Sequence, residues 1–539
     1  MSTNELNKNL LESASTINTE SFITSELYRN SNSMNDKIVN RLQDMSINKL
    51  LWQFALPAIL ANSVSAVTNG LQTTVQKNIM GNDGISAQSI VQPLELMLTM
   101  YIAVGLSGGV VSFISPAFGS KDMKTAQKYL MHFMVLYFFV IVLVPLCTLP
   151  WLKQIVVLLG APAGSDMAEY AYQYGLVIFS CGTVFYFINY GFGNILRATS
   201  RSVFNAVKQI ITASLQLCFI YIFYYTIVKQ HPSLYYSALS PVLSNALCAV
   251  PVILLFIPFK KHFTNFKLKF AKTQIQIRIL AQIIYYSVPD MLTQFQTPLI
   301  VTVANILLSK VSISDAETTQ WISNLGIVYQ LSALIQVTNQ SFSYAFGPIF
   351  GYALGAKNWK RIREIMLKTL LWQTGTGLVC WIILNIFVDK FCLNLMQGYI
   401  PQADEVSFGF RCFNACMPVM SCFLCVNDIN QMEQKPMKAF LVQISRLVFI
   451  VVFEAILCLT LQDQKGIYYA FIIGDVLSAI IGAVNFTERY LIYGKLEKGE
   501  ITAEQAGLGD KSGNKKKMKD KLYEQVDAMC EDDKSDEIK

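Results

Sequence analysis

The most constraining feature of this 539-residue sequence is a series of twelve long apolar segments. Each is long enough to supply a helix of the roughly 20 residues that cross a bilayer. Only 15% of the residues are charged, whereas soluble proteins carry about 25%. The sequence therefore predicts an all-α integral membrane protein with twelve transmembrane helices. The segments lie at approximately 50–76, 86–116, 127–150, 168–195, 203–228, 234–259, 279–309, 319–352, 364–388, 405–430, 437–461 and 466–493.

Positive charge alternates along the gaps between these segments. The even-numbered gaps are rich in Lys and Arg, and the odd-numbered gaps hold about one cation each. Because loops rich in Lys and Arg stay in the cytoplasm, we expect the even gaps and both termini to be cytoplasmic. The plasma membrane is the default location. Cations of the even gaps include Lys121, Arg197, Arg201, Lys260, Arg278, Lys357 and Lys435.

One turn sequence occurs twice at half-chain spacing. The first copy, which begins at position 117, reads Ala-Phe-Gly-Ser-Lys-Asp-Met-Lys, and the second, which begins at position 353, reads Ala-Leu-Gly-Ala-Lys-Asn-Trp-Lys. We expect Gly119 and Gly355 to take the left-handed backbone that ends a helix. We expect Asp122 and Asn358 to cap the helix that follows.

Nearly the same spacing recurs elsewhere in the chain. Pro57 is followed at almost this interval by Pro289, and Gly175 is followed by Gly409. Each half therefore holds six helices in the same order, and both halves enter the membrane from the same side. This predicts two six-helix bundles related by a parallel pseudo-two-fold repeat, with its axis along the membrane normal.

These patterns divide the chain into five regions. Residues 1–48 are polar and form an expected disordered arm. Residues 49–260 and 279–494 form the two bundles, and the basic linker 261–278 joins them. Residues 495–539 form a charged cytoplasmic tail.

Asp428 is the first candidate for an ion or substrate site. A charge at mid-membrane costs about 2.5–3.5 kcal/mol on insertion scales, so it calls for a function or a partner. Asp428 is flanked by Asn427 and Asn430. Carboxylate and amide oxygens suit a hard cation such as sodium, and a carboxyl group also exchanges protons. The alternative is an ion pair with Lys435 or Lys438 near the cytoplasm.

Four further charged residues are candidates, each with a structural alternative. Asp475 either contributes to the site or forms a structural ion pair with Arg446. Asp290 either faces a cavity or pairs with Arg278. Glu95 either faces the cavity or lies among the outer headgroups.

Uncharged polar residues are concentrated in the seventh and eighth segments. Amides that face lipid would be unfavourable, so we expect these side chains to face the bundle interior. There they contact substrate or form hydrogen bonds between helices. They are Gln294, Gln296, Asn305, Asn324, Gln330, Gln336, Asn339 and Gln340.

Other chemistries lack a sequence signal. No phosphate-binding loop of the Gly-x-x-x-x-Gly-Lys-Ser/Thr type is present, so an ATP-driven pump is not expected. The cysteines of the tenth segment have no histidine nearby, which favours packing over a metal site. The net charge of +7 is too small and too dispersed to indicate nucleic-acid binding.

The chain resembles the multidrug and toxic compound extrusion (MATE) family, most closely its DinF-like branch. The specific part of the resemblance is the run from Phe346 to Arg361 around the second turn. Gly105 and Gly108 fit the family, as do Arg446 and Asp475. The resemblance covers about residues 48–494.

The resemblance implies a transporter and not an enzyme. It implies a secondary antiporter that exports organic, often cationic, compounds in exchange for sodium ions or protons. Two bundles around a central cavity would give alternating access. We expect no cofactor besides the coupling ion. The expected partners are a small organic substrate and the lipid bilayer, with no nucleic acid, and the protein is expected to be a monomer.

The sequence departs from the family at two positions. The family usually has an Asp in helix 1, where this chain has Gln72, and often an Asn…Leu-Asp pattern in helix 5, where it has Thr212, Leu215 and Gln216. A neutral amide cannot bind and release a proton. We therefore expect cation binding in the C-terminal half, at Asp428 with help from Asp475 or Asp290, to release the substrate.

Two alternative functions remain open at this point. A lipid-linked oligosaccharide flippase shares this general architecture. It would need a cationic cavity lined by arginines, and in this chain only Arg411 and Arg446 are expected to lie deep in the membrane. A non-transporting membrane receptor or scaffold would use the N-terminal arm and the charged tail as docking sites.

Overall fold

The computed structural model describes residues 45–159, 164, 166–198, 201–228, 233–256, 275–395 and 400–508. Within these ranges the regular secondary structure is entirely helical. Almost all of the predicted N-terminal arm and most of the predicted linker lie outside the described residues, as does the tail beyond residue 508. The boundaries of the five predicted regions therefore stay predictions.

The helices of the N-terminal half are α2 (Ile47–Glu95), η1 (Leu96–Tyr101), α3 (Ile102–Gly119), α4 (Met123–Thr148), η2 (Leu149–Trp151), α5 (Leu152–Leu158), α6 (Asp166–Val177), η3 (Ile178–Gly182), α7 (Thr183–Ala198), α8 (Ser202–Phe223), η4 (Tyr224–Val228) and α9 (Leu234–Phe256). Those of the C-terminal half are α10 (Ile277–Val311), α11 (Asp315–Gly355), α12 (Trp359–Leu395), α13 (Ile400–Asn414), α14 (Ser421–Met432), α15 (Pro436–Leu461) and α16 (Lys465–Lys498).

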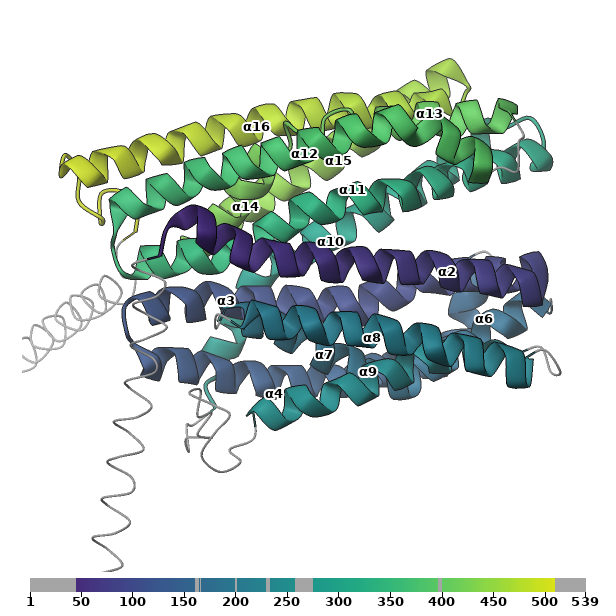
Figure 1. Cartoon of the computed structure of the whole chain (residues 1–539), viewed down its shortest axis with the longest axis horizontal. Coiled ribbons are helices and arrows are strands. Elements are labelled where there is room, and N and C mark those ends of the chain that lie inside the picture. Colours follow the sequence, from purple (N-terminus) through teal and green to yellow (C-terminus); the bar gives the residue numbers. More distant parts are fainter. Residues whose placement is uncertain are drawn as a thin grey trace, which may run out of the picture.

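The two halves form two bundles of long, nearly parallel helices, one above the other in Figure 1. The first helix of each half lies at the boundary and packs on both bundles. Thus α2 contacts α8 of its own half and α11 of the other, and α10 contacts α15 of its own half and α3 of the other. This exchange of partners is the pseudo-two-fold arrangement that the repeat predicted.

Nine of the described helical stretches are long and apolar enough to cross a membrane. They correspond to nine of the twelve predicted segments. The first, eighth and tenth segments are not among the nine that the search of the described residues found. The tenth is divided into α13 and α14, of 15 and 12 residues, and the eighth is rich in amides, Asn324 to Gln340. A helix that turns a polar stripe toward the interior reads as less apolar than one surrounded by lipid.

Three segment boundaries were predicted wrongly. The helix α2 continues through the gap expected between the first two segments. The third segment ends in a short 3₁₀ turn, η2, followed by α5. The tenth is interrupted between Asn414 and Ser421, where Pro418 lacks the N–H that a continuous helix needs.

The repeated turns have the same backbone geometry, although their glycines act differently from the prediction. The left-handed residues are Lys121 (φ 60°) and Lys357 (φ 54°), and not Gly119 or Gly355. In each turn the capping residue donates its N–H to a carbonyl of the preceding helix, over 2.8 Å and 3.1 Å. The glycines are needed for close approach, because a Cβ at Gly119 would lie 2.0 Å from the carbonyl oxygen of Tyr352.

A matching turn pattern relates the ends of α7 and α14. The N–H of Arg201 donates to the carbonyl of Leu196, and the N–H of Lys435 donates to that of Asn430, both over 2.8 Å. Arg201 and Lys435 are separated by the same number of residues as Gly175 and Gly409, the two glycines paired in the sequence repeat. Positions related by this interval are therefore structural equivalents in this part of the molecule.

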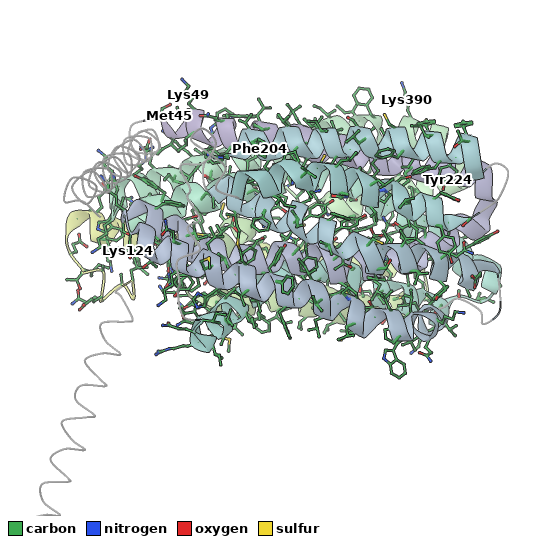
Figure 2. The ribbon with its side chains drawn as sticks, turned by 90° about the horizontal axis from the view of Figure 1, so that it is seen from below. Met45, Lys49, Lys124, Phe204, Tyr224 and Lys390 are labelled. Atoms are coloured by element: carbon green, nitrogen blue, oxygen red, sulfur yellow. The ribbon has the colours of Figure 1, made fainter. Side chains whose placement is uncertain are left out.

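The end of the molecule that carries these four turns is called the turn end below. Lys49 and Lys124 lie at this end, and Lys390 lies at the opposite one (Figure 2). The halves pack tightly at the turn end, where a Cβ at Gly355 would lie 1.9 Å from the carbonyl oxygen of Pro116. The same core region joins Ile47 and Phe54 of α2 to residues of α11, α12 and α14.

Candidate functional site

A cavity of about 370 Å³ lies between the two halves, with walls from α3 and α7 on one side and from α10, α11, α14, α15 and α16 on the other. Five charged residues line it: Arg197, Asp290, Asp428, Arg446 and Asp475. Four of them were candidates from the sequence. The fifth, Arg197, was assigned to a cytoplasmic loop, and that assignment was wrong.

Asp290 and Asp428 form what we call the acidic corner of the cavity, together with Gln431. The amide of Gln431 donates to Oδ1 of Asp290. Both carboxyl groups line the same cavity, and like charges that share a poorly solvated site repel each other. Arg278 is not the partner of Asp290, and Lys435 pairs with Glu433 and not with Asp428.

Asp290 also contacts the other half of the molecule. Its Oδ2 lies where a side chain on Gly108 would be, 1.7 Å from an ideal Cβ at that position. Gly108 therefore makes the room in α3 for this carboxyl group. A single carboxyl group thus touches α14 through Gln431 and α3 through Gly108, on opposite sides of the boundary.

The surroundings of Asp428 are rich in oxygen atoms. Asn427 and Ser343 line the cavity beside it. Among the described residues, Asp428 Oδ2, Asn427 Oδ1 and Ser343 Oγ have no well-formed hydrogen bond. Oxygen ligands of this kind suit a hard cation, and a protonated carboxyl group would also supply a donor to them.

Arg197, Asn194 and Tyr344 form what we call the arginine corner. The guanidinium of Arg197 lies over the Tyr344 ring, with its carbon 4.1 Å from the ring centroid. Asn194 lines the cavity one turn earlier on α7 and donates to Ser107 Oγ over 2.9 Å. The i, i+3 spacing of Asn194 and Arg197 on one helix face was the signal that the sequence analysis missed.

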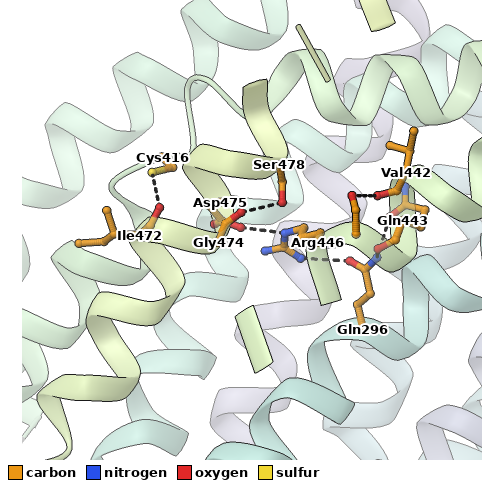
Figure 3. A network of polar contacts seen from close by, with 10 residues as sticks. Gln296, Cys416, Val442, Gln443, Arg446, Ile472, Gly474, Asp475 and Ser478 are labelled. Atoms are coloured by element: carbon orange, nitrogen blue, oxygen red, sulfur yellow. Dashed lines mark hydrogen bonds and ion pairs between the residues drawn. The ribbon is translucent and has the colours of Figure 1, made fainter. Parts of the chain in front are cut away.

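Arg446 and Asp475 form an ion pair, which was one of the two alternatives that the sequence left open for Asp475. Arg446 Nε donates to Asp475 Oδ1 over 2.8 Å, and Nη1 reaches Gln296 Oε1 over 3.2 Å. Gln296 in turn donates to the Gln443 side chain over 2.8 Å, so the network ties α10, α15 and α16 together (Figure 3). Both ends of the pair line the cavity.

Two other candidates lie inside the N-terminal bundle and do not line this cavity. Glu95 is buried and accepts a hydrogen bond from Tyr174 over 2.9 Å. Gln72 is buried and accepts one from Gln216 over 2.7 Å. The structure therefore pairs the two amides, Gln72 and Gln216, that the sequence analysis singled out.

Asn305 and Arg411 also lie apart from the cavity lining. Asn305 is on α10, and its Oδ1 is buried with no hydrogen bond among the described residues. Arg411 pairs with Asp389 over 2.6 Å, and both side chains are about half exposed. Arg411 is thus a surface residue, and its expected depth was wrong.

Several amides of α11 face the interior, as expected. Gln336, Asn339 and Gln340 line the cavity. Asn339 donates to the carbonyl of Met417, in the interruption between α13 and α14. This bond satisfies part of a backbone that would otherwise be unpaired within the membrane.

Within the part of the chain that the structure describes, no three His, Cys, Asp or Glu side chains are grouped as metal ligands would be. The charged chemistry of the described cavity therefore consists of its acids, its two arginines and its amides. These can hold small cations and polar parts of an organic molecule.

Comparison with known proteins places these features in a family. The family model MatE matches residues 57–222 and 289–456. The two matches begin at Pro57 and Pro289, the prolines that the repeat analysis paired. A search of curated proteins finds no match to the sequence.

Solved transporter structures share the fold at low identity. MATE in complex with MaL6 gives a TM-score of 0.75 at 18% identity, covering 84% of this chain and 99% of that one. An outward-facing multidrug resistance MATE family transporter of the MOP superfamily gives 0.74 at 19%, covering 84% and 98%. A MOP superfamily transporter from Pyrococcus furiosus Vc1, described by a binding pocket of reverse polarity, gives 0.74 at 18%, covering 85% and 98%.

Proposed function

The chain belongs to the MatE family, and we propose that it is a secondary active antiporter that exports organic compounds in exchange for sodium ions or protons. Family and fold make it a multi-pass membrane transporter. The exchange, its direction and its coupling ion are the proposal.

The observation that carries this proposal is the position of Asp290 in the acidic corner. Two carboxyl groups that repel each other hold a proton or a metal cation more readily than one alone. Asp290 touches both halves, through Gln431 and Gly108. Binding of a cation there changes the charge at the boundary itself, so it can favour one arrangement of the halves over the other.

The packing of the halves fits one state of an alternating-access cycle. The halves meet at the turn end through Gly119 and Gly355, and the cavity lies beyond that contact. If the turn end is cytoplasmic, as the basic gaps predict, this state is closed to the cytoplasm. In this state the exported compound would leave first. A cation would then enter from outside, bind at the acidic corner and favour reopening of the turn end.

Gradient-driven flux in proteoliposomes tests the proposal. A fluorescent organic cation is loaded, and a sodium gradient or a pH gradient is imposed separately. We expect one of them to drive flux, and Asp428→Asn to reduce that flux by about tenfold or more, since about 1.4 kcal/mol of coupling is a factor of ten.

Asp389→Asn is the matched control, because Asp389 is a surface acid paired with Arg411. It should leave the flux unchanged. If neither gradient drives flux in the wild-type protein, the antiporter proposal is wrong. If Asp428→Asn transports normally, the acidic corner is not the coupling site.

The flippase alternative receives less support from this cavity. Arg411 is at the surface, and the charge of Arg446 is matched by Asp475. A cavity for a polyanionic lipid carrier would present several unmatched cations. Transfer of a labelled lipid phosphate between leaflets of the same proteoliposomes would distinguish the two functions.

A further inference from the structure

The pseudo-two-fold repeat relates the two corners of the cavity position by position. The turn hydrogen bonds at the ends of α7 and α14 fix the interval between equivalent positions. At that interval Asn194 is the counterpart of Asp428, and Arg197 is the counterpart of Gln431. The same helix face therefore carries acid and amide in one half, and amide and guanidinium in the other.

The guanidinium of Arg197 retains hydrogen-bonding capacity. Its Nε and Nη1 are buried, and neither has a hydrogen-bond partner among the described residues. Stacking on Tyr344 occupies the face of the group and leaves its edge, where the N–H donors are. A guanidinium binds a carboxylate or phosphate with two parallel hydrogen bonds, either from Nε and Nη2 or from Nη1 and Nη2. Each of these pairs includes one of the two nitrogens of Arg197 that have no partner among the described residues.

The charges around Arg197 leave it without an acid of its own. Of the three acids that line the cavity, Asp475 is paired with Arg446, Asp290 accepts from Gln431, and no ion pair joins Asp428 to Arg197. The buried ammonium of Lys208 donates to the carbonyl of Asn189, on the helix that also carries Arg197, over 2.6 Å, so it adds a second positive charge against that helix. A guanidinium with two buried nitrogens that lack partners is costly, and an anion would reduce that cost.

We propose that the arginine corner, formed by Asn194, Arg197 and Tyr344, is an anion subsite for an acidic group of the exported compound. The group is a carboxylate, phosphate or sulfonate. This inference rests on the proposed export function and narrows its substrate class. The preferred compounds carry an acid at the arginine corner, and an amine on the same molecule would point toward the acidic corner.

A matched pair of dyes tests the subsite by binding alone. One is a rhodamine with a free benzoate, and the other is the methyl ester of the same dye, which lacks the anion. Binding of each to the purified full-length protein is measured by fluorescence anisotropy. We expect the wild-type protein to bind the free acid more tightly than the ester.

Arg197→Gln should weaken binding of the free acid by about 10-fold to 100-fold, the range for a hydrogen bond to a charged group. Binding of the ester should change by less than about twofold. Arg197→Lys keeps the positive charge but lacks the two parallel N–H donors of the guanidinium, so it should weaken free-acid binding by an intermediate amount. Arg411→Gln, which removes a surface arginine, is the control, and the unfolding temperature of each variant establishes that it is folded.

Equal losses for both dyes in Arg197→Gln would show that Arg197 only joins the halves through Tyr344, and would overturn the subsite. So would a wild-type protein that binds the ester as tightly as the free acid, or one that binds neither the dyes nor a labelled lipid phosphate. A labelled lipid phosphate is the third probe. If it binds in place of the dye and is lost in Arg197→Gln, the subsite stands and its acid belongs to a lipid.

These outcomes are separate from those of the proposed function. Gradient-driven flux of the ester tests coupling without using the anion subsite. If the ester moves under a gradient and Arg197→Gln does not affect free-acid binding, the antiporter stands and the subsite fails. If Arg197→Gln selectively loses the free acid and no gradient drives flux, the subsite stands and the coupling fails.

Discussion

The two corners of the cavity occupy equivalent positions in the two halves and carry opposite charge. Asp428 and Gln431 stand in the C-terminal half where Asn194 and Arg197 stand in the N-terminal half. The turns that follow them are alike, with the same hydrogen bond over 2.8 Å. The two halves therefore share the structure of their helix ends, because backbone groups there need partners in any sequence. The side chains that face the cavity are not under this constraint, and they differ between the halves.

The deeper interiors of the halves differ in the same way. In the N-terminal half Gln72 and Gln216 form a neutral buried pair. The C-terminal equivalent of Gln72, at the interval that separates Pro57 from Pro289, is Ala304. The equivalent of Gln216, at the interval that separates Gly175 from Gly409, is Ile450, and both are fully buried. The C-terminal half instead has a charged pair between α15 and α16. Each bundle therefore matches its polar groups internally, at a different place.

The largest effect on stability is expected from breaking the charged pair that distinguishes the C-terminal half. Removing one member of a buried ion pair costs about 3–5 kcal/mol, because the other charge stays buried. Arg446→Met should therefore lower the free energy of unfolding by about 3 kcal/mol or more. The double variant Arg446→Met with Asp475→Leu should recover most of that loss, because it leaves no buried charge. Denaturant unfolding in detergent measures both.

The surface pair of Arg411 and Asp389 provides the control for this experiment. Exposed pairs contribute about 0–1 kcal/mol, so Arg411→Met should have little effect. If Arg446→Met costs no more than Arg411→Met, the network in Figure 3 is not what stabilises the C-terminal bundle. If the double variant is stable and loses gradient-driven flux, the pair also belongs to the transport site.

The next largest effect on stability is expected at the contact between the halves that Gly119 and Gly355 form at the turn end. Gly119→Ala and Gly355→Ala each place a methyl group about 2 Å from a backbone oxygen of the other half. Overpacking of this kind costs about 1–3 kcal/mol, so each variant should be destabilised by that amount. Because both glycines lie in one contact, the double variant should lose less than the sum.

Gly375→Ala is the matched control, since a Cβ there would have no atom within 4 Å. Gly375 is within α12, where alanine is favoured over glycine by about 1 kcal/mol. This variant should therefore be slightly more stable than the wild type. Additive losses for Gly119 and Gly355 would mean that the two turns do not share a contact.

Much of the fold and half of the candidate cavity were predictable, because a membrane restricts the options. Long apolar runs predict spanning helices, and charges within them need partners, so Arg446 and Asp475 could be paired in advance. Asp290 and Asp428 were candidates for the same reason. The interruption of the tenth segment had a local signal in Pro418, which the apolar run obscured.

The remainder depends on contacts between distant segments. Whether a glycine is needed for its own backbone angle or for the approach of another helix cannot be read locally, and Gly119 and Gly355 proved to be the second kind. Arg197 looked like a loop cation, because a charge count takes no account of helix faces. Glu95 is buried against Tyr174, which lies on a different helix, and no periodicity indicates that contact.

The smallest effect separates the two turns by their capping residues. Asp122 accepts from the backbone N–H of Thr125, as Asn358 accepts from that of Arg361, both over 3.1 Å. Loss of such a cap costs about 1 kcal/mol, so Asp122→Ala and Asn358→Ala should cost similar amounts near neutral pH.

The two caps should respond differently to acid. The hydroxyl and backbone N–H of Thr125 lower the pKa of Asp122. A carboxyl group with a lowered folded-state pKa stabilises the protein above its unfolded pKa, about 3.9 for Asp. That stability is lost as the pH falls through the folded-state pKa. The cost of Asp122→Ala should therefore shrink between about pH 5 and pH 3, while that of Asn358→Ala stays constant. Unfolding of both variants across this range measures the difference, and a parallel response would mean that the Asp122 carboxylate is not the cap.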